Sequence, residues 1–434
     1  MNKLKQRIKE KWGEAGFQRY FRNTGWMFGA RVLTLLINLF VSIFIAKQLG
    51  PEQYGTFSFI ISFVSIAGFT LFAIDSLVMK RLNEDKDSTD KILGSALAIK
   101  FVNSLFTITT ATLAGLIFAN TSTTVLMIFV YSTFTIFQSF GVIDFYFKIN
   151  VQNKPISILS IVVVSLSSVI KIGILYYNLP LVYLLLSYVL DHIIGAIGYI
   201  YLYKKYVGSI FNFSVEKNIV KGLIIKSWPL TISALATTIY IRIDQIFIKV
   251  LLGSESLGLY AIAVRFSEVW FIISEVMCLS LLPAILNAEK TNNELFLSRS
   301  KRLYSLLFYS AIGVCIIMYV ISPILINTLY GEAYSQSVNI LRLYIWSIVG
   351  FFIATALNQF LFAKGKLKTI LFMNIIGMSL SVALNYILIP ILGIQGAILA
   401  NIVAYTLPFI IILSLKNMRE QRITFIKAVV NPFT

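Results

Sequence analysis

The chain has 434 residues, of which 58% are hydrophobic and only 13% are charged, and its mean hydropathy is +0.82. A soluble protein of this length cannot bury so much apolar surface, so the composition excludes an ordinary soluble globular protein and indicates an integral membrane protein. The net charge of +18 does not indicate nucleic-acid binding, because membrane proteins concentrate lysine and arginine in cytoplasmic loops. We therefore expect membrane lipid as a partner and no nucleic acid.

Twelve apolar runs are long enough to cross a ~30 Å hydrocarbon core, which takes about 20 helical residues. In chain order they are 24–47, 54–79, 92–119, 122–146, 155–176, 180–203, 226–251, 258–286, 304–329, 338–362, 367–390 and 394–415. The first run is not followed by a small-residue cleavage site, so we expect it to stay in the membrane.

Lysine and arginine are unevenly distributed over the segments that connect these runs. The connectors at 80–91, 147–154, 204–226, 287–303 and 363–368, together with both terminal segments, hold 29 of the 37 basic residues. The connectors of the opposite side have only Lys47 and Lys249, both at helix ends. Because basic residues are retained on the cytoplasmic side, this pattern predicts an even number of helices with both termini cytoplasmic.

The N-terminal segment, residues 1–23, is basic and has apolar residues interspersed. It forms either an amphipathic helix on the anionic inner leaflet or a cytoplasmic leader that only sets orientation.

Two blocks of sequence repeat at a constant offset of 203 residues, Ile43–Phe57 and Ile246–Tyr260. Both contain Ile-Phe-Ile, Leu-Gly and the turn Gly-x-Glu-x-x-Gly, and each lies where the first helix of a six-helix half meets the second. Chance similarity between apolar segments is the alternative, but the matched turn argues against it. Repeats of equal orientation predict two halves related by an axis along the membrane normal.

We therefore predict an all-α integral membrane protein of about 12 transmembrane helices, built as two six-helix lobes related by a pseudo-twofold along the membrane normal. The lobes span residues 24–215 and 216–415, preceded by the leader 1–23 and followed by a cytoplasmic tail, 416–434.

Ionisable residues inside the spans cost about 2.5–3.5 kcal/mol each on insertion scales and therefore mark cavities or ion pairs. The cations are Arg31, Lys100, Lys171, Arg242, Arg265 and Arg342, and the acids are Asp75, Asp144, Asp191, Asp244, Glu268 and Glu275. We interpret the cations as the wall of a hydrated cavity for an anionic substrate, because arginine and lysine bind phosphate oxygens. The acids either couple transport to an ion or pair with the cations.

Several of these residues have a structural alternative. Arg265 and Glu268 lie three residues apart on one helix face and could form an ion pair. Asp144 is close enough to a helix end to reach the interface. His192, beside Asp191, is either a proton relay or a hydrogen-bonded structural residue.

The sequence lacks the GxxxxGK[ST], HExxH, CxxC and GxSxG motifs. Cys278 and Cys315 lie in apolar runs and resemble small buried hydrophobes. We expect no enzymatic activity, no cofactor and no metal.

Several motifs resemble the polysaccharide-unit flippases of the multidrug/oligosaccharidyl-lipid/polysaccharide exporter superfamily. They are Leu49-Gly-Pro-Glu-Gln-Tyr-Gly55, Tyr240-Ile-Arg-Ile-Asp-Gln245, Gly258-Leu-Tyr-Ala-Ile-Ala-Val-Arg265 and Leu384-Asn-Tyr-Ile-Leu-Ile-Pro390 with Gly393-Ile-Gln-Gly-Ala397. The resemblance covers most of the chain. One departure is Asp75, which stands where many relatives have a glycine-rich turn and which could pair with Arg31 or Lys100.

The resemblance implies a flippase that moves an undecaprenyl-diphosphate-linked oligosaccharide from the inner to the outer leaflet of the bacterial cytoplasmic membrane, for O-antigen- or capsule-type polysaccharide. It implies alternating access, with Arg31, Arg242 and Arg265 at the positions of the family's cavity cations. Further partners would be H⁺ or Na⁺, acting through Asp244, Glu268 or Glu275, and the polysaccharide polymerase machinery.

Two other functions stay open. A cation-coupled multidrug antiporter of the same superfamily predicts a cavity dominated by acids. A membrane polymerase or glycosyltransferase predicts a large charged loop on the outer side, where every predicted loop is short.

Overall fold

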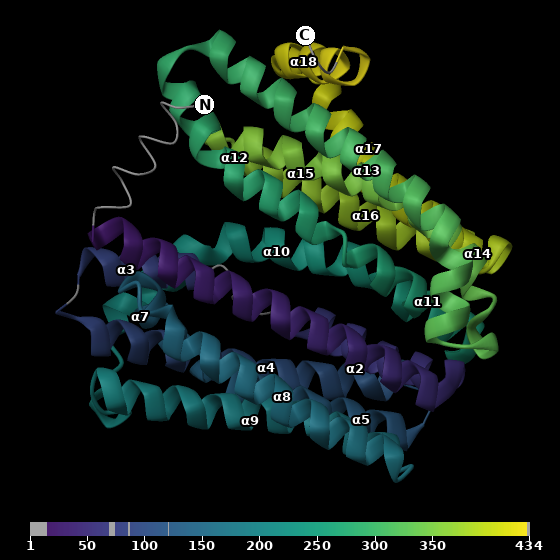
Figure 1. Cartoon of the computed structure of the whole chain (residues 1–434), viewed down its shortest axis with the longest axis horizontal. Coiled ribbons are helices and arrows are strands. Elements are labelled where there is room, and N and C mark those ends of the chain that lie inside the picture. Colours follow the sequence, from purple (N-terminus) through teal and green to yellow (C-terminus); the bar gives the residue numbers. More distant parts are fainter. Residues whose placement is uncertain (1–14, 69–73, 86, 120, 432–434) are drawn as a thin grey trace. The chain divides into compact units, whose positions relative to one another are not determined.

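The computed structural model describes residues 15–68, 74–85, 87–119 and 121–431, and the regular elements in these ranges are helices throughout (Figure 1). This confirms the predicted all-α fold. Most of the predicted leader lies outside the described residues; from Ala15 onward it belongs to the first helix, α2 (Ala15–Ala67).

The chain divides into two compact units. Unit 1 comprises residues 1–48 and 67–231, and unit 2 comprises residues 49–66 and 232–434. Helix α2 and helix α10 (Lys217–Leu252) each contribute to both units. The predicted lobe boundaries differ from this division and stay a prediction.

Unit 1 is built around a core that includes the fully buried Ile74, Leu93, Phe147 and Tyr203. Its other helices are α3 (Ile74–Glu84), α4 (Thr89–Phe118), α5 (Ser122–Ser132), α6 (Phe134–Gln138), α7 (Val142–Ile149), α8 (Asn153–Tyr176) and α9 (Leu181–Tyr206). Helix α8 packs along α9, and α4 packs against α5.

Unit 2 contains the helices that follow α10. They are α11 (Ser254–Glu268), α12 (Phe271–Thr291), α13 (Asn293–Leu329), α14 (Ser337–Tyr344), α15 (Ser347–Ala363), α16 (Leu367–Leu392), α17 (Ile394–Ser414) and α18 (Arg419–Val430). Helix α17 packs against both α15 and α16, and α13 packs against α12, α15 and α18.

Ten helices in the described residues are long and apolar enough to cross a membrane. The first of them, Gly25–Ala67, covers residues 25–47 of the first predicted span and residues 54–67 of the second, and the backbone break at Gly50 lies between the two. The predicted span 226–251 lies in α10, whose apolar part carries Arg242 and Asp244 and which is not among the ten. The described parts of the predicted spans are mostly helical, with short interruptions such as the turns at Thr133, Val269–Trp270 and Ile345–Trp346.

The sequence repeat has a counterpart in the backbone. Gly50 breaks α2 with φ 69° and ψ 172°, and Gly253, its equivalent 203 residues later, separates α10 from α11 with φ 91° and ψ 178°. Glycine adopts such positive φ values without the steric cost that a side chain would add. Both repeats therefore interrupt their helices at the same residue in nearly the same conformation.

The two repeats also contact each other within unit 2, through a pair of glycines. A β-carbon at Gly55 would lie 1.8 Å from the Ser254 carbonyl oxygen, and one at Gly258 would lie 1.8 Å from the Pro51 carbonyl oxygen. Gly258 is the repeat equivalent of Gly55, and Pro51 is the equivalent of Ser254, so the two contacts are the same contact with the repeats exchanged. Such reciprocity is the property of a contact formed about a local two-fold axis. We name this close approach of Pro51–Gly55 and Ser254–Gly258 the glycine seam.

We predict that Gly55→Ala and Gly258→Ala each lower the thermal stability of the purified protein in detergent. Either methyl group would collide with a backbone carbonyl, and such overpacking costs about 1–3 kcal/mol. Gly173→Ala and Gly313→Ala are matched controls, because nothing lies within 4 Å of a β-carbon there. A melting temperature that falls equally in all four variants, or in none, would contradict the packing described for the seam.

Candidate functional site

Unit 1 contains a polar cavity of about 490 Å³. Its lining comes from α2, α3, α4, α9 and the segment from α6 to α7. The charged side chains of the lining are Arg31, Asp75, Lys100, Asp144 and Lys148. Three of these five residues, Arg31, Asp75 and Lys100, are predicted site residues, and the structure brings them together although they are far apart in sequence.

Two ion pairs hold the lysines of this cavity. Lys100 Nζ lies 2.7 Å from Asp75 Oδ1, and Lys148 Nζ lies 2.6 Å from Asp144 Oδ2. Both ammonium groups also lie over the ring of Phe145, 5.1 and 5.8 Å from its centroid. Asp75 therefore pairs with Lys100, one of its two predicted partners, and each lysine is held in place by a neighbouring carboxylate.

Arg31 is the third cation of the cavity and is exposed. Among the residues that the structure describes, no carboxylate lies within ion-pair distance of its guanidinium. Three cations and two carboxylates leave the lining with one positive charge at neutral pH. The lining would therefore attract an anion. Arg31 is the cation of the cavity that has no ion pair with a described acid, so its guanidinium donors can bind the anion.

Lys171 and Asp191 form a separate buried pair between α8 and α9. Their charged atoms lie 2.5 Å apart, and the Lys171 side chain is only 5% exposed. Lys171 also donates to Ser167 Oγ at 2.7 Å and lies 3.8 Å from the ring centroid of Tyr188. Neither member of the pair lines the 490 Å³ cavity, and their contacts are those of a pair that fastens two helices together.

His192 stacks on Phe134, with ring centroids 4.8 Å apart. This packing contact between α9 and α6 corresponds to the structural alternative for that residue.

In unit 2, Arg242 of α10 pairs with Glu268 of α11. Two guanidinium nitrogens lie 2.8 and 3.1 Å from the two carboxylate oxygens, the fork geometry that arginine forms with a carboxylate. The sequence suggested Arg265 as the partner of Glu268. The structure places Arg242 of the preceding helix there, and the pairing of Arg265 with Glu268 stays a prediction.

Asp244 lies two residues beyond Arg242 and is fully buried. Its Oδ2 accepts hydrogen bonds from the Tyr260 hydroxyl at 2.5 Å and from Asn401 Nδ2 at 2.6 Å, and its Oδ1 accepts one from the Gln245 amide at 2.7 Å. Within the described residues no cation forms an ion pair with it. Burying a carboxylate without a paired cation costs roughly several kcal/mol, so this position favours uptake of a proton or a metal cation.

The remaining predicted residues are dispersed. Arg265 is exposed on α11 and lies near the side chains of Tyr54 and Tyr330. Glu275 is exposed on α12. Arg342 Nε donates to the Tyr319 carbonyl at 3.2 Å, and its guanidinium lies 5.0 Å from the Tyr319 ring centroid. Arg342 therefore has a packing role on α13, and its predicted role in substrate binding is unsupported by these contacts.

Sequence reasoning missed three members of these clusters. Lys148 was counted with the connector cations, although its position four residues after Asp144 is the spacing of a helical ion pair. Tyr260 and Asn401 were not singled out because both are uncharged. An asparagine in the middle of the apolar run 394–415 was nevertheless a usable signal, since a buried amide needs hydrogen-bond partners.

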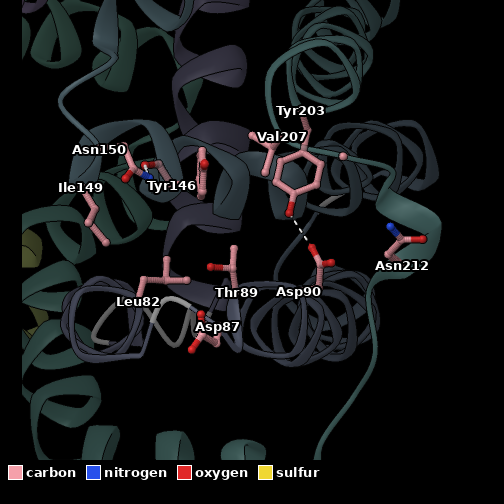
Figure 2. A pocket seen from close by; sticks show the side chains of 11 residues that line it. Leu82, Asp87, Thr89, Asp90, Tyr146, Ile149, Asn150, Tyr203, Val207 and Asn212 are labelled. Atoms are coloured by element: carbon pink, nitrogen blue, oxygen red, sulfur yellow. Dashed lines mark hydrogen bonds between the residues drawn. The ribbon is translucent and has the colours of Figure 1, made fainter.

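A second cavity of unit 1, about 330 Å³, lies where α4 and α9 meet charged connectors. Figure 2 shows Tyr203 pointing toward Asp90, and its hydroxyl donates to Asp90 Oδ1 at 2.6 Å. Among the described residues that line it, the charged ones are Asp87 and Asp90. This cavity is therefore a poor site for an anion, and the 490 Å³ cavity is the better candidate.

Comparison with known families gives two matches. The family described as polysaccharide biosynthesis protein matches residues 20–289, and the MatE family matches residues 229–387. A comparison with curated protein sequences gives no match.

Solved structures of similar fold are membrane transporters. An inward-facing multidrug resistance MATE transporter of the MOP superfamily is 14% identical, with 92% of this chain and 96% of that chain covered and a TM-score of 0.74. The lipid II flippase MurJ in an inward closed conformation is 16% identical, with 94% and 91% covered and a TM-score of 0.65. A MOP superfamily transporter from Pyrococcus furiosus, whose binding pocket is described as having reversed polarity, is 15% identical, with 95% and 96% covered and a TM-score of 0.63.

At these identities the structural matches establish the fold alone. The polysaccharide biosynthesis match covers more than half of the 434 residues, and the all-helical fold with its membrane-spanning helices agrees with it. The chain belongs to the polysaccharide biosynthesis protein family, and its fold is that of multi-pass membrane transporters and flippases.

Proposed function

We propose that the protein moves an undecaprenyl-diphosphate-linked oligosaccharide repeat unit from the inner to the outer leaflet of the bacterial cytoplasmic membrane. The product would enter surface polysaccharide of the O-antigen or capsule type, and polymerase machinery would be the next partner. The observation that carries this proposal is the cavity of unit 1, whose lining has a net positive charge and an arginine without an acidic partner in the described residues. The family match and the likeness in fold to a lipid II flippase support it.

The lining of this cavity suits both parts of such a head group. Arg31 offers paired donors to phosphate oxygens, and Lys100 and Lys148 add positive charge nearby. Asn103, Gln138, Thr135, Ser139 and Tyr199 also line the cavity and offer amide and hydroxyl groups to sugar hydroxyls. Its volume of about 490 Å³ falls within the range typical of small-molecule sites.

The membrane potential favours the proposed direction of movement. A diphosphate with about two negative charges gains roughly 4–5 kcal/mol per 100 mV on leaving an inside-negative cell, at about 2.3 kcal/mol per charge. In this proposal the head group crosses by alternating access, while the polyprenyl tail stays in the lipid. Outward movement of the transporter with bound substrate is then favoured by the membrane potential. The return of the empty transporter to the inward-facing state is the step that needs an ion.

We assign that coupling to Asp244. Glu268 is neutralised by Arg242, and Glu275 is exposed, whereas Asp244 is fully buried with only neutral donors around it. The Oδ1 atom of Asn401 is also buried and has no hydrogen-bond partner in the described part of the chain. A proton or Na⁺ bound to the Asp244 carboxylate would neutralise its charge and so remove the free-energy cost of burying it. The bound ion would therefore stabilise the conformation in which Asp244 is buried.

A cation-coupled multidrug antiporter is the second candidate, favoured by the MatE match and by the fold of the multidrug transporter. The charge of the unit 1 cavity argues against it, since an organic cation would enter a lining that is already positive. Loss of surface polymer without a change in drug sensitivity in a deletion strain would separate the two functions.

We predict that Arg31→Ala reduces surface polysaccharide about tenfold or more at unchanged membrane levels of the protein. The loss of a charge-assisted hydrogen bond costs about 1.5–3 kcal/mol, and Arg31→Lys should recover part of the output. Arg342→Ala is the matched control, because that arginine contacts the Tyr319 carbonyl and ring. Normal polymer in the Arg31→Ala strain would remove the basis for the proposed cavity.

We predict that Asp244→Asn abolishes the response of the transport rate to ion gradients. Purified protein in sealed vesicles would be assayed with a Na⁺ gradient, a pH gradient and neither. The wild type should respond to one gradient, because only the carboxylate binds the ion, and Glu275→Gln should behave as the wild type. An Asp244→Asn variant that keeps the wild-type response would show that coupling occurs elsewhere.

A further inference from the structure

The C-terminal segment ends in a helix that is docked onto unit 2. Helix α18 begins a few residues after α17, and it packs against α13 (Figure 1). Ser305 Oγ donates to the Ala428 carbonyl at 2.9 Å, and the Tyr309 hydroxyl donates to the Val429 carbonyl at 2.6 Å. The rings of Tyr304 and Phe425 meet edge to face, 5.6 Å apart. Within the predicted cytoplasmic tail, 416–434, the residues of α18 are therefore packed on the rest of unit 2.

Helix α18 exposes its largest aliphatic side chains and buries polar ones. Against the protein it buries Gln421 and Thr424, which are polar, together with the small Ala428. The outer face exposes Ile423, Ile426 and Val430 by 41%, 53% and 68%. In a helix at a water-exposed surface the apolar side chains would lie inward and the polar ones outward.

Cations border this exposed apolar stripe. At 3.6 residues per turn, Arg422 and Lys427 fall on opposite edges of the stripe formed by Ile423, Ile426 and Val430, and both are exposed. Arg419, four residues before Ile423, is exposed at the N-terminal end of the same stripe, and Glu420 is the one acid of the helix. Apolar residues in the centre with basic residues at the edges are typical of helices that lie in the membrane interface.

The place of α18 in the fold puts this face at a membrane surface. Helix α17 is a candidate membrane span that ends at Ser414, and only residues 415–418 separate it from α18. Lys366 Nζ lies 3.8 Å from Met418 Sδ, so α18 starts beside the basic connector at 363–368. This end of unit 2 is the end that carries the basic connectors, which the charge distribution predicts to be cytoplasmic.

We propose that α18 is an interfacial helix that binds the surface of an anionic lipid leaflet. Ile423, Ile426 and Val430 enter the boundary between headgroups and acyl chains, and Arg422 and Lys427 contact lipid phosphates. The partner is a bilayer rather than a soluble protein, because the same narrow face combines apolar side chains with basic ones at the level where a membrane span ends. This inference is independent of the transported substrate.

Spin labelling of the full-length protein tests the position of α18. In a variant with Cys278→Ala and Cys315→Ala, a nitroxide is placed at Ile426→Cys, and the protein is reconstituted in phosphatidylcholine vesicles with one quarter phosphatidylglycerol. Val320→Cys, at an exposed apolar position of α13, and Glu84→Cys, at an exposed charged one, are the reference sites. We expect the label at residue 426 to resemble Val320→Cys, with high accessibility to oxygen and low accessibility to a water-soluble nickel complex.

Two results would overturn the proposal. Nickel accessibility equal to that of Glu84→Cys would place the stripe in water, and spin–spin broadening would show that a second copy of the chain covers it.

The anionic part of the proposal has its own test. The double substitution Arg422→Gln with Lys427→Gln is introduced into the protein labelled at Ile426→Cys. In vesicles with phosphatidylglycerol it should raise the accessibility of the label to the nickel complex about threefold, because each basic residue adds attraction to an anionic surface. The same pair should have little effect in pure phosphatidylcholine. Lys80→Gln with Lys205→Gln, which removes two exposed lysines of unit 1, is the matched control. Equal accessibility with and without the α18 cations in the anionic vesicles would contradict recognition of anionic lipid.

Discussion

An ionised side chain in the hydrocarbon region of a bilayer must be paired, hydrated or neutralised, and the polar interior of this protein follows from that requirement. Lys171 and Asp191 satisfy it by pairing in a buried contact between two helices. Arg242 and Glu268 satisfy it with a two-pronged ion pair. Arg31 satisfies it in a polar cavity, where two lysine–aspartate pairs surround it without neutralising it. Asp244 is fully buried, accepts hydrogen bonds from neutral donors and forms no ion pair within the described residues, and this is why we propose it as the position at which an ion matters.

The glycine seam gives the chain a second organising feature. Pro51–Gly55 and Ser254–Gly258 approach so closely that neither glycine leaves room for a methyl group, and each repeat supplies the carbonyl that the other repeat's glycine contacts. Thr56 and Ser254 add a hydrogen bond at 3.1 Å, and Ser62 donates to Gln245 at 2.7 Å, next to Asp244. A chain of contacts thus runs from the seam to the buried acid within unit 2, so occupancy of Asp244 and packing of the seam have a physical route by which to influence each other.

Much of this fold was predictable, because hydropathy and charge act locally along the chain. Apolar runs gave the helices, and the matched Gly50 and Gly253 gave the repeat. The partners of the intramembrane charges were harder, because they depend on which helices become neighbours: Glu268 of α11 meets Arg242 of α10, 26 residues away. Helix α18 escaped prediction because it buries the polar Gln421 and Thr424 and exposes Ile423, Ile426 and Val430 among charged residues, so that it has no continuous apolar face toward the protein.

The central claim is that an anionic, lipid-linked glycan crosses the membrane through this protein. It is tested most directly with purified protein in sealed vesicles that contain a fluorescent undecaprenyl-diphosphate-linked oligosaccharide, with a membrane-impermeant quencher added outside. The account predicts that substrate from the inner leaflet becomes quenchable in vesicles with wild-type protein, and far more slowly with Arg31→Ala. Quenching no greater than in protein-free vesicles, together with uptake of an organic cation by the same preparation, would contradict it.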